Sequence, residues 1–187
     1  MRQPRTAPSA VLALLGLTAC ALHHVPAPPP GQPADVAAMT SVVERTRSHP
    51  PHRGFSLAVA PVTLNYEADI YRLDLRPEFS AAVADLVTKG GRLDTIPPPF
   101  IGGIRVRHLA AFDRYDLAQY LLLRFSPVGF SADSTRAALL VVFDCGPGCG
   151  SQAGVGLRRG GNGGWRIAQY RRRPLPTPAE PSDQEPR

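Results

Sequence analysis

The chain has no hydrophobic segment long enough to cross a bilayer. Its N-terminal apolar run covers residues 11–17 and includes one glycine, whereas a spanning helix needs about 20 apolar residues. Lysine is also scarce, since Lys89 is the only lysine among 21 basic residues. The formal net charge is +6, yet no basic helix or aromatic-interleaved basic patch is visible, which argues against a nucleic-acid partner. A mild positive excess instead favours anionic lipid headgroups or cell-wall polymers.

The short apolar run has the features of an export signal. Arg2 and Arg5 precede it, and the sequence Leu-Thr-Ala-Cys follows it at 17–20. The run has the length of a signal-peptide hydrophobic region, which ends in small residues at a cleavage site. The alternative is a buried N-terminal helix in a cytosolic protein.

The pattern at 17–20 resembles the lipobox of bacterial lipoproteins. The resemblance implies export, cleavage before Cys20 and diacylation of the Cys20 thiol, so that Cys20 is the lipidation site and the membrane is reached through the lipid. Two or more acyl chains hold a protein stably on a membrane. Residue Ala21, which is not Asp, implies the outer membrane and its periplasmic face, within the bacterial cell envelope.

Composition divides the chain into four expected segments. They are a lipoprotein signal peptide at 1–19, a lipidated tether at 20–52, an α+β domain at 53–173 and a disordered tail at 174–187. The tether includes the proline-rich stretch 21–33, which predicts an extended spacer. A possible short helix follows at 34–47, with Val36, Met39, Val42 and Val43 on one face.

The domain is expected to be small, with one or two helices and a C-terminal antiparallel β-meander. A helix is predicted over 77–89, with Pro77 in its first turn and glycines at its end; its expected buried stripe is Phe79, Val83, Leu86 and Val87. The segment 96–103 is expected to be a loop, and 104–112 a strand or a short helix.

Apolar patterning predicts the strands. They are expected at 55–64, 121–130, 137–144, 153–159 and 165–173. Short turns rich in Gly and Asp join the last four, which is typical of a meander. The continuous apolar run 137–144 predicts a central strand that is buried on both faces.

The last third of the chain also resembles a family of uncharacterised bacterial proteins. The matching motifs are FSPVGF at 125–130, CGPGCG at 145–150 and GWRI at 164–167. They are similar to a pattern of the form FS-x-VGF, CG-x-x-CG and G-x-W-x-V over about 50 residues. The resemblance implies a β-region and no known activity.

The two cysteines at 145 and 149 allow three interpretations. If the chain is exported and Cys20 carries lipid, the two remaining thiols are expected to form a disulfide between Cys145 and Cys149. A thioredoxin-like redox pair is the second interpretation, although Asp144 would raise the pKa of a neighbouring thiol and the spacing has one extra glycine. A metal site is the third, but no histidine lies at a usable spacing.

Catalytic patterns are weak. The stretch GFSLA at 54–58 faintly resembles a hydrolase nucleophile elbow around Ser56, with His108 and Asp113 or Asp116 as imaginable partners. The non-catalytic alternative is a surface serine at the start of a strand. The glycines at 146, 148 and 150 are not followed by the Lys-Ser/Thr pair of a phosphate loop.

The sequence therefore predicts a membrane-anchored envelope lipoprotein with a binding or scaffolding role. No catalytic residue, metal ligand or cofactor is assigned, and the expected partner is an envelope protein, a cell-wall component or a lipid. The alternative is an envelope hydrolase or thiol-redox enzyme with an unrecognised site.

Overall fold

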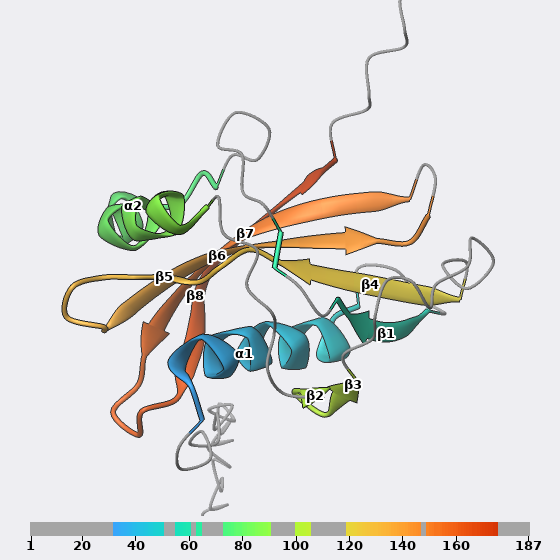
Figure 1. Ribbon diagram of the computed structural model, residues 1–187, viewed down its shortest axis with the longest axis horizontal. Helices are drawn as coiled ribbons and strands as arrows, with labels where there is room; N and C mark the ends of the chain where they lie inside the picture. The colour runs from blue at the N-terminus through green and yellow to red at the C-terminus, as the bar shows by residue number, and fades with distance from the viewer. Residues whose placement is uncertain are drawn as a thin grey trace, which may run out of the picture.

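The computed structural model describes residues 32–50, 55–60, 63–64, 73–90, 100–105, 119–146 and 149–175. The expected signal peptide, Cys20, most of the proline-rich spacer and the C-terminal tail from residue 176 lie outside these ranges. The described residues form a mixed α/β fold, with a six-stranded and mostly antiparallel sheet between two helices (Figure 1).

The sheet contains the predicted meander. Strands β4 (Tyr120–Phe125), β6 (Arg136–Asp144), β7 (Gly150–Arg159) and β8 (Trp165–Pro174) are neighbours in this order, and each pair is antiparallel. Strand β5 (Gly129–Phe130) pairs with β6 beside β4. The short turns after β6 and β7 make these pairings local, which is why the sequence pattern reveals them.

Strand β6 is the predicted central strand. Every residue from 137 to 143 is buried. Alternate side chains point to opposite faces of a strand, so Leu139 and Val141 contribute to one core cluster and Leu140 and Val142 to another. The continuous apolar run is explained by a helix on each face of the sheet.

An edge strand of the sheet is parallel, which the sequence did not indicate. Strand β1 (Ser56–Val59) lies within the predicted 55–64 segment and pairs with β4 in parallel, with Leu57 opposite Leu121. Parallel neighbours need a long crossover between them. The 60 residues between Val59 and Tyr120 supply it, and a connection of that length carries no local signal of the pairing it permits.

The predicted strand 121–130 is interrupted, because the chain bends at Ser126 and Pro127. Proline has no N–H to donate to a ladder. The hydroxyl oxygen of buried Ser126 accepts a hydrogen bond from the N–H of Leu140 at 2.8 Å, and the N–H of Ser126 donates to the carbonyl of Leu140 at 2.9 Å. Ser126 thus satisfies the backbone N–H and carbonyl of Leu140 in the central strand where the regular pairing with β4 stops. The pairing with β6 continues in β5.

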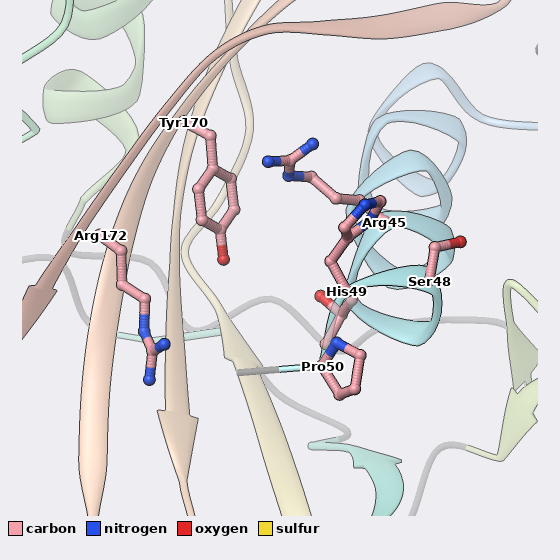
Figure 2. A pocket seen from close by; sticks show the side chains of 7 residues that line it. Arg45, Ser48, His49, Pro50, Tyr170 and Arg172 are labelled. Carbon is pink, nitrogen blue, oxygen red and sulfur yellow. The ribbon is translucent and has the colours of Figure 1, made fainter. Parts of the chain in front are cut away.

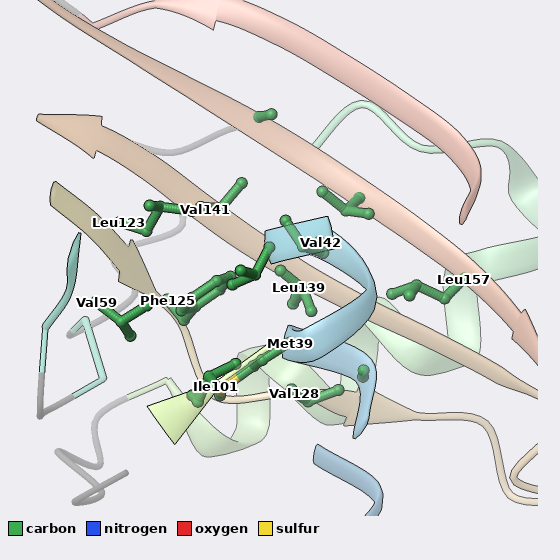
Figure 3. Close-up of a cluster of buried hydrophobic side chains, with 14 of the residues drawn as sticks. Met39, Val42, Val59, Ile101, Leu123, Phe125, Val128, Leu139, Val141 and Leu157 are labelled. Carbon is green, nitrogen blue, oxygen red and sulfur yellow. The ribbon is translucent and has the colours of Figure 1, made fainter. Parts of the chain in front are cut away.

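Helix α1 (Ala34–Ser48) lies across one face of the sheet (Figure 1). The face predicted from the sequence is buried, because Val36, Met39, Val42 and Val43 are all at most 3% exposed. Figure 3 shows Met39 and Val42 among the side chains of the strands. The helix was expected within the tether 20–52, but its buried contacts make it part of the folded unit, which therefore begins before residue 53.

The second helical segment covers the opposite face. A 3-10 turn, η1 (Pro77–Phe79), leads into α2 (Ser80–Lys89), as predicted for 77–89. Phe79 and Leu86 are fully buried, but Val83 is only partly buried and Val87 is 47% exposed. The buried face of the helix is therefore narrower than predicted. Ala82 is buried on it, whereas Val87 lies about 100° around the helix from Leu86 and outside the contact with the sheet.

The backbones of α2 and β5 approach each other closely, which leaves room for only a narrow buried face on the helix. A Cβ added at Gly129 would lie 2.0 Å from the carbonyl oxygen of Ala82 and 2.4 Å from the backbone nitrogen of Leu86. Only glycine allows the helix backbone to come so near to the strand. This contact gives a physical reason for the glycine in the FSPVGF motif.

Side chains of α2 also complete the hydrogen bonding of β5. Asp85 accepts hydrogen bonds from the N–H of Phe130 at 2.8 Å and from Lys89 at 2.6 Å, and Lys89 also donates to the carbonyl of Val128 at 3.1 Å. Desolvation raises the pKa of Asp85, but these hydrogen bonds and the positive charge of Lys89 outweigh it, so the pKa lies below its usual value. The single lysine thus has a structural role.

The expected loop at 96–103 is in part a hairpin. Strands β2 (Phe100–Ile101) and β3 (Ile104–Arg105) pair around Gly102 and Gly103, whose φ angles are +54° and +76°. Two central residues with positive φ are typical of a tight hairpin turn. Ile101 is fully buried in the same core cluster as α1, so the hairpin closes this side of the core.

Candidate functional site

The connection between β6 and β7 is closed by a disulfide bond between Cys145 and Cys149, as expected. Their Cα atoms are 5.2 Å apart, within the range that a disulfide can bridge. The N–H of Cys145 donates to the carbonyl of Cys149 at 3.0 Å, and the N–H of Cys149 donates to the carbonyl of Gly146 at 3.1 Å. Gly146 has a φ of +99°, a conformation that glycine adopts readily. The bond therefore fastens a tight hairpin.

The surroundings of the disulfide favour a structural role. Cys145 is 6% exposed and belongs to the core cluster that α1 covers. The preceding Asp144 accepts a hydrogen bond from the N–H of Gly146 at 3.2 Å, so its carboxylate is turned toward the hairpin. Low-pKa thiolates are often found at helix N-termini, whereas Cys145 and Cys149 lie between the ends of strands β6 and β7.

A surface pocket of about 410 Å³ lies between the end of α1 and strand β8. Arg45, Thr46, Ser48, His49 and Pro50 line it from the helix side. Tyr170 and Arg172 line it from the strand side, as Figure 2 shows. The two groups of residues are more than 100 positions apart in the sequence, and the packing of α1 on the sheet brings them together.

Strand geometry explains why Tyr170 and Arg172 face the helix. Residues two apart on a strand share a face, and Tyr170 packs against the core cluster under α1. The Nε of Arg172 donates to the hydroxyl of Ser151 on the neighbouring strand at 3.0 Å. A register irregularity at Gly156/Leu157 of β7 shifts the pairing with β8 by one residue, which leaves Tyr170 on the same face as Trp165.

The aromatic ring of Tyr170 contacts the guanidinium group of Arg45, which projects from α1 on the other side of the pocket. The guanidinium carbon of Arg45 lies 4.8 Å from the centre of the Tyr170 ring, within the distance of a cation–π interaction. Burial raises the pKa of the Tyr170 hydroxyl, while Arg172 and Arg45 lower it in part, and the pKa remains above its usual value. The hydroxyl is therefore protonated near neutral pH and can donate a hydrogen bond.

The pocket is lined by polar groups and positive charge. Arg45 and Arg172 carry positive charges, and Thr46, Ser48, His49 and Tyr170 add polar groups, whereas no acidic side chain is among the described residues that line the pocket. Such a lining suits a negatively charged ligand group. This pocket, referred to below as the α1–β8 pocket, is the candidate binding site.

The other residues considered from the sequence are not brought to this pocket. Ser56 is exposed at the start of β1 and is followed by a strand, where a nucleophile elbow needs a helix. His108, Asp113, Asp116 and Cys20, the expected lipidation site, lie outside the described residues. Within the described residues, no group of His, Cys, Asp and Glu side chains could hold a metal ion, and no helix is long and apolar enough to cross a membrane.

The α1–β8 pocket was not predicted from the sequence, where residues 165–173 are expected only as a strand and 34–47 as a helix within the tether. Alternation along β8 places Arg172 on the face of Tyr170, but the register irregularity at Gly156/Leu157 is what brings both to the face of Trp165, so the strand half of the pocket was readable only in part. The helix half was not, because no local pattern shows which strand a helix covers.

Comparisons with known proteins add no relative from which a function could be transferred. No protein-family model, no curated protein and no solved structure matches the chain.

Proposed function

We propose that the protein is a lipid-anchored binding protein of the bacterial envelope, held at a membrane through Cys20. The expected location is the periplasmic face of the outer membrane. Its folded domain has a binding or scaffolding role and needs no catalytic group. Two of the three cysteines are joined to each other, and the third follows the Leu-Thr-Ala sequence of a lipobox.

The disulfide carries the proposal. Stable disulfides are typical of oxidising compartments such as the periplasm and are rare in the cytosol. The pairing of Cys145 with Cys149 also leaves Cys20 without a disulfide partner in the chain. A thiol that is consumed by lipid needs no such partner, so export and acylation together account for all three cysteine thiols.

The α1–β8 pocket supports the binding part of the proposal. Its lining combines cations and hydrogen-bond donors from two elements, and envelopes are rich in anionic lipids and polymers. A small number of convergent polar groups in a concave site is typical of ligand pockets.

Labelling with radioactive palmitate tests the anchor. We expect label on the wild-type chain and none on the Cys20→Ser variant, which should also leave the membrane fraction. The Cys145→Ser variant is the matched control, because it removes a thiol of the same chain and should keep its label. Equal labelling of wild type and Cys20→Ser would refute acylation at this residue.

A further inference from the structure

We infer that a row of three arginines, Arg136, Arg158 and Arg166, docks the folded domain on an anionic lipid bilayer. The choice of a bilayer as the partner rests on the proposed anchor at Cys20, because the anchor brings the domain to a membrane. The row itself follows from the pairing of the strands and does not depend on the anchor.

Strand pairing places the three arginines side by side. Arg158 of β7 lies opposite Arg136 of β6 and also opposite Arg166 of β8. Directly paired residues share a face of the sheet, and their Cβ atoms are about 5 Å apart. The shared face is the one that η1 and α2 cover, since Glu78 of η1 forms an ion pair with Arg158. Three positive charges therefore lie next to one another, an arrangement that destabilises a sheet unless anions compensate it.

The neighbouring carboxylates compensate the row only in part. Glu78 pairs with Arg158. Asp133 lies in the turn before Arg136, and its carboxylate accepts hydrogen bonds from within that turn at 2.7 and 3.1 Å. Arg166 is exposed and has no ion-pair partner among the residues that the structure describes. The row therefore keeps an excess of positive charge on the surface.

The first turn of α1 lies at the same end of the sheet as the row. The hydroxyl of Ser41 donates to the carbonyl of Trp165 at 3.0 Å, and Trp165 directly precedes Arg166. Further along the helix, Arg45 contacts the ring of Tyr170. The helix thus runs beside β8 in roughly the same direction, and its first residue lies about 10 Å of helix before Ser41. The start of α1 is therefore beyond the start of β8, near the turn that joins β7 to β8 (Figure 1).

The chain between Cys20 and α1 keeps this end of the domain near the anchored residue. Residues 21–33 can extend by at most about 45 Å, at up to about 3.5 Å per residue. A tied domain meets the bilayer at a high effective concentration, so contacts that are weak in solution suffice to orient it. Guanidinium groups also bind phosphate oxygens in a forked geometry. The anchor favours a bilayer over a soluble anionic polymer, because it concentrates only the bilayer.

The turn between β7 and β8 leaves the row accessible to a surface. Its residues 160–164 are Gly-Gly-Asn-Gly-Gly, and a Cβ added at Gly161 would meet no atom within 4 Å. Arg159, whose guanidinium carbon is 6.0 Å from the centre of the Trp165 ring, lies on the other face, as does Asp35 in the first turn of α1. These two charges offset each other, so the positive excess at this end belongs to the row.

Flotation of the full chain with lipid vesicles tests the inference. The vesicles contain phosphatidylcholine alone or phosphatidylcholine with phosphatidylglycerol, and the chain carries Cys20→Ser so that no acyl group holds it. All variants share the same N-terminal residues, so differences between variants report on the folded domain. We expect stronger binding to the vesicles with phosphatidylglycerol, and this preference should fall as salt is raised, because salt screens exposed charges.

Substitutions of two exposed arginines connect the binding to the row. Arg166→Gln should weaken binding to the anionic vesicles about fivefold, because one cation near an anionic surface is lost. Arg166→Lys keeps the charge and should restore most of the affinity. Arg47→Gln is the matched control, since Arg47 is exposed in the last turn of α1, at the opposite end of the helix from the tether. It should change the affinity by less than about twofold.

The outcomes separate the docking surface from the anchor. No preference for anionic vesicles, or equal losses in Arg166→Gln and Arg47→Gln, would overturn the docking surface. Binding of polyglutamate that depends on Arg166, without binding to vesicles, would assign an anionic polymer and overturn the bilayer. A thermal melt shows whether each variant is folded, and Arg136→Gln provides a second variant if Arg166→Gln does not fold. The chain in this assay carries no acyl group, so palmitate labelling can fail while the docking surface holds, and the reverse.

Discussion

Removal of the Cys145–Cys149 disulfide should destabilise the domain modestly without unfolding it. The perturbation is the double substitution Cys145→Ala and Cys149→Ala, which leaves no unpaired thiol in the hairpin. Cys145 is buried in the core and Cys149 packs against it, so alanine at both positions preserves an apolar environment better than serine does.

The magnitude follows from the length of the closed loop. The bond joins residues four apart in sequence. Closing a loop of about five residues lowers the conformational entropy of the unfolded chain, which raises the free energy of unfolding by roughly 2 kcal/mol. A domain is typically stable by about 5–15 kcal/mol, so the variant should still fold. For a domain of this size, about 2 kcal/mol corresponds to a melting temperature lower by about 4–8 °C.

Thermal and urea unfolding of both proteins, with and without reductant, measures the effect. Reductant should lower the stability of the wild type to that of the double variant and leave the variant unchanged. Equal melting temperatures of wild type and variant under oxidising conditions would refute the stabilising role. Reduction of the wild type by millimolar glutathione would also contradict it, because a structural disulfide resists that reductant.

Two further substitutions test the contacts around β5. Ser126→Ala should lower the free energy of unfolding by about 1–3 kcal/mol, because the buried N–H of Leu140 loses its acceptor at 2.8 Å; urea unfolding measures it. Gly129→Ala should cost about 1–3 kcal/mol or more, because its Cβ would lie 2.0 Å from the carbonyl oxygen of Ala82, and hydrogen exchange should show lost protection in α2.

Matched substitutions at open positions provide the controls. Ser56→Ala changes an exposed serine at a strand start, and Gly161→Ala adds a Cβ with no atom within 4 Å. Both should leave stability nearly unchanged. Losses as large as those at Ser126 and Gly129 would show that the cost arises from the residue type and not from the contacts described.

The meander and both helices could be predicted because their signals are local. Alternation, apolar runs and glycine-rich turns define β6 to β8, and Pro77 with its following apolar residues defines the start of the second helical segment. Parallel pairing of β1 with β4 could not be predicted, since a connection of about 60 residues allows many arrangements. The position of α1 on the sheet could not be predicted for the same reason. Local patterning shows that the helix is amphipathic, but it does not show which strands the helix covers.

The break between β4 and β5 illustrates a second limit. The apolar pattern of 121–130 continues across Pro127, and it predicted one uninterrupted strand. The interruption depends on a side-chain hydrogen bond from the next strand to Ser126, which no periodicity shows. Pro127 was the available signal, because proline in a run indicates an edge strand or a bend.

The candidate site divides in the same way. The disulfide was predictable, because two close cysteines and an export pattern allow one simple pairing. The α1–β8 pocket was not, because Arg45 and Arg172 meet only through the packing of a helix on a sheet.

Mass spectrometry of the intact chain from fractionated cells tests the central claim most directly. The account predicts that the protein is recovered from the membrane fraction with Cys20 as its first residue, with acyl groups on that residue and with Cys145 and Cys149 lacking two hydrogens between them. Recovery from the cytosol of a full-length chain with three free thiols would contradict both the anchor and the compartment.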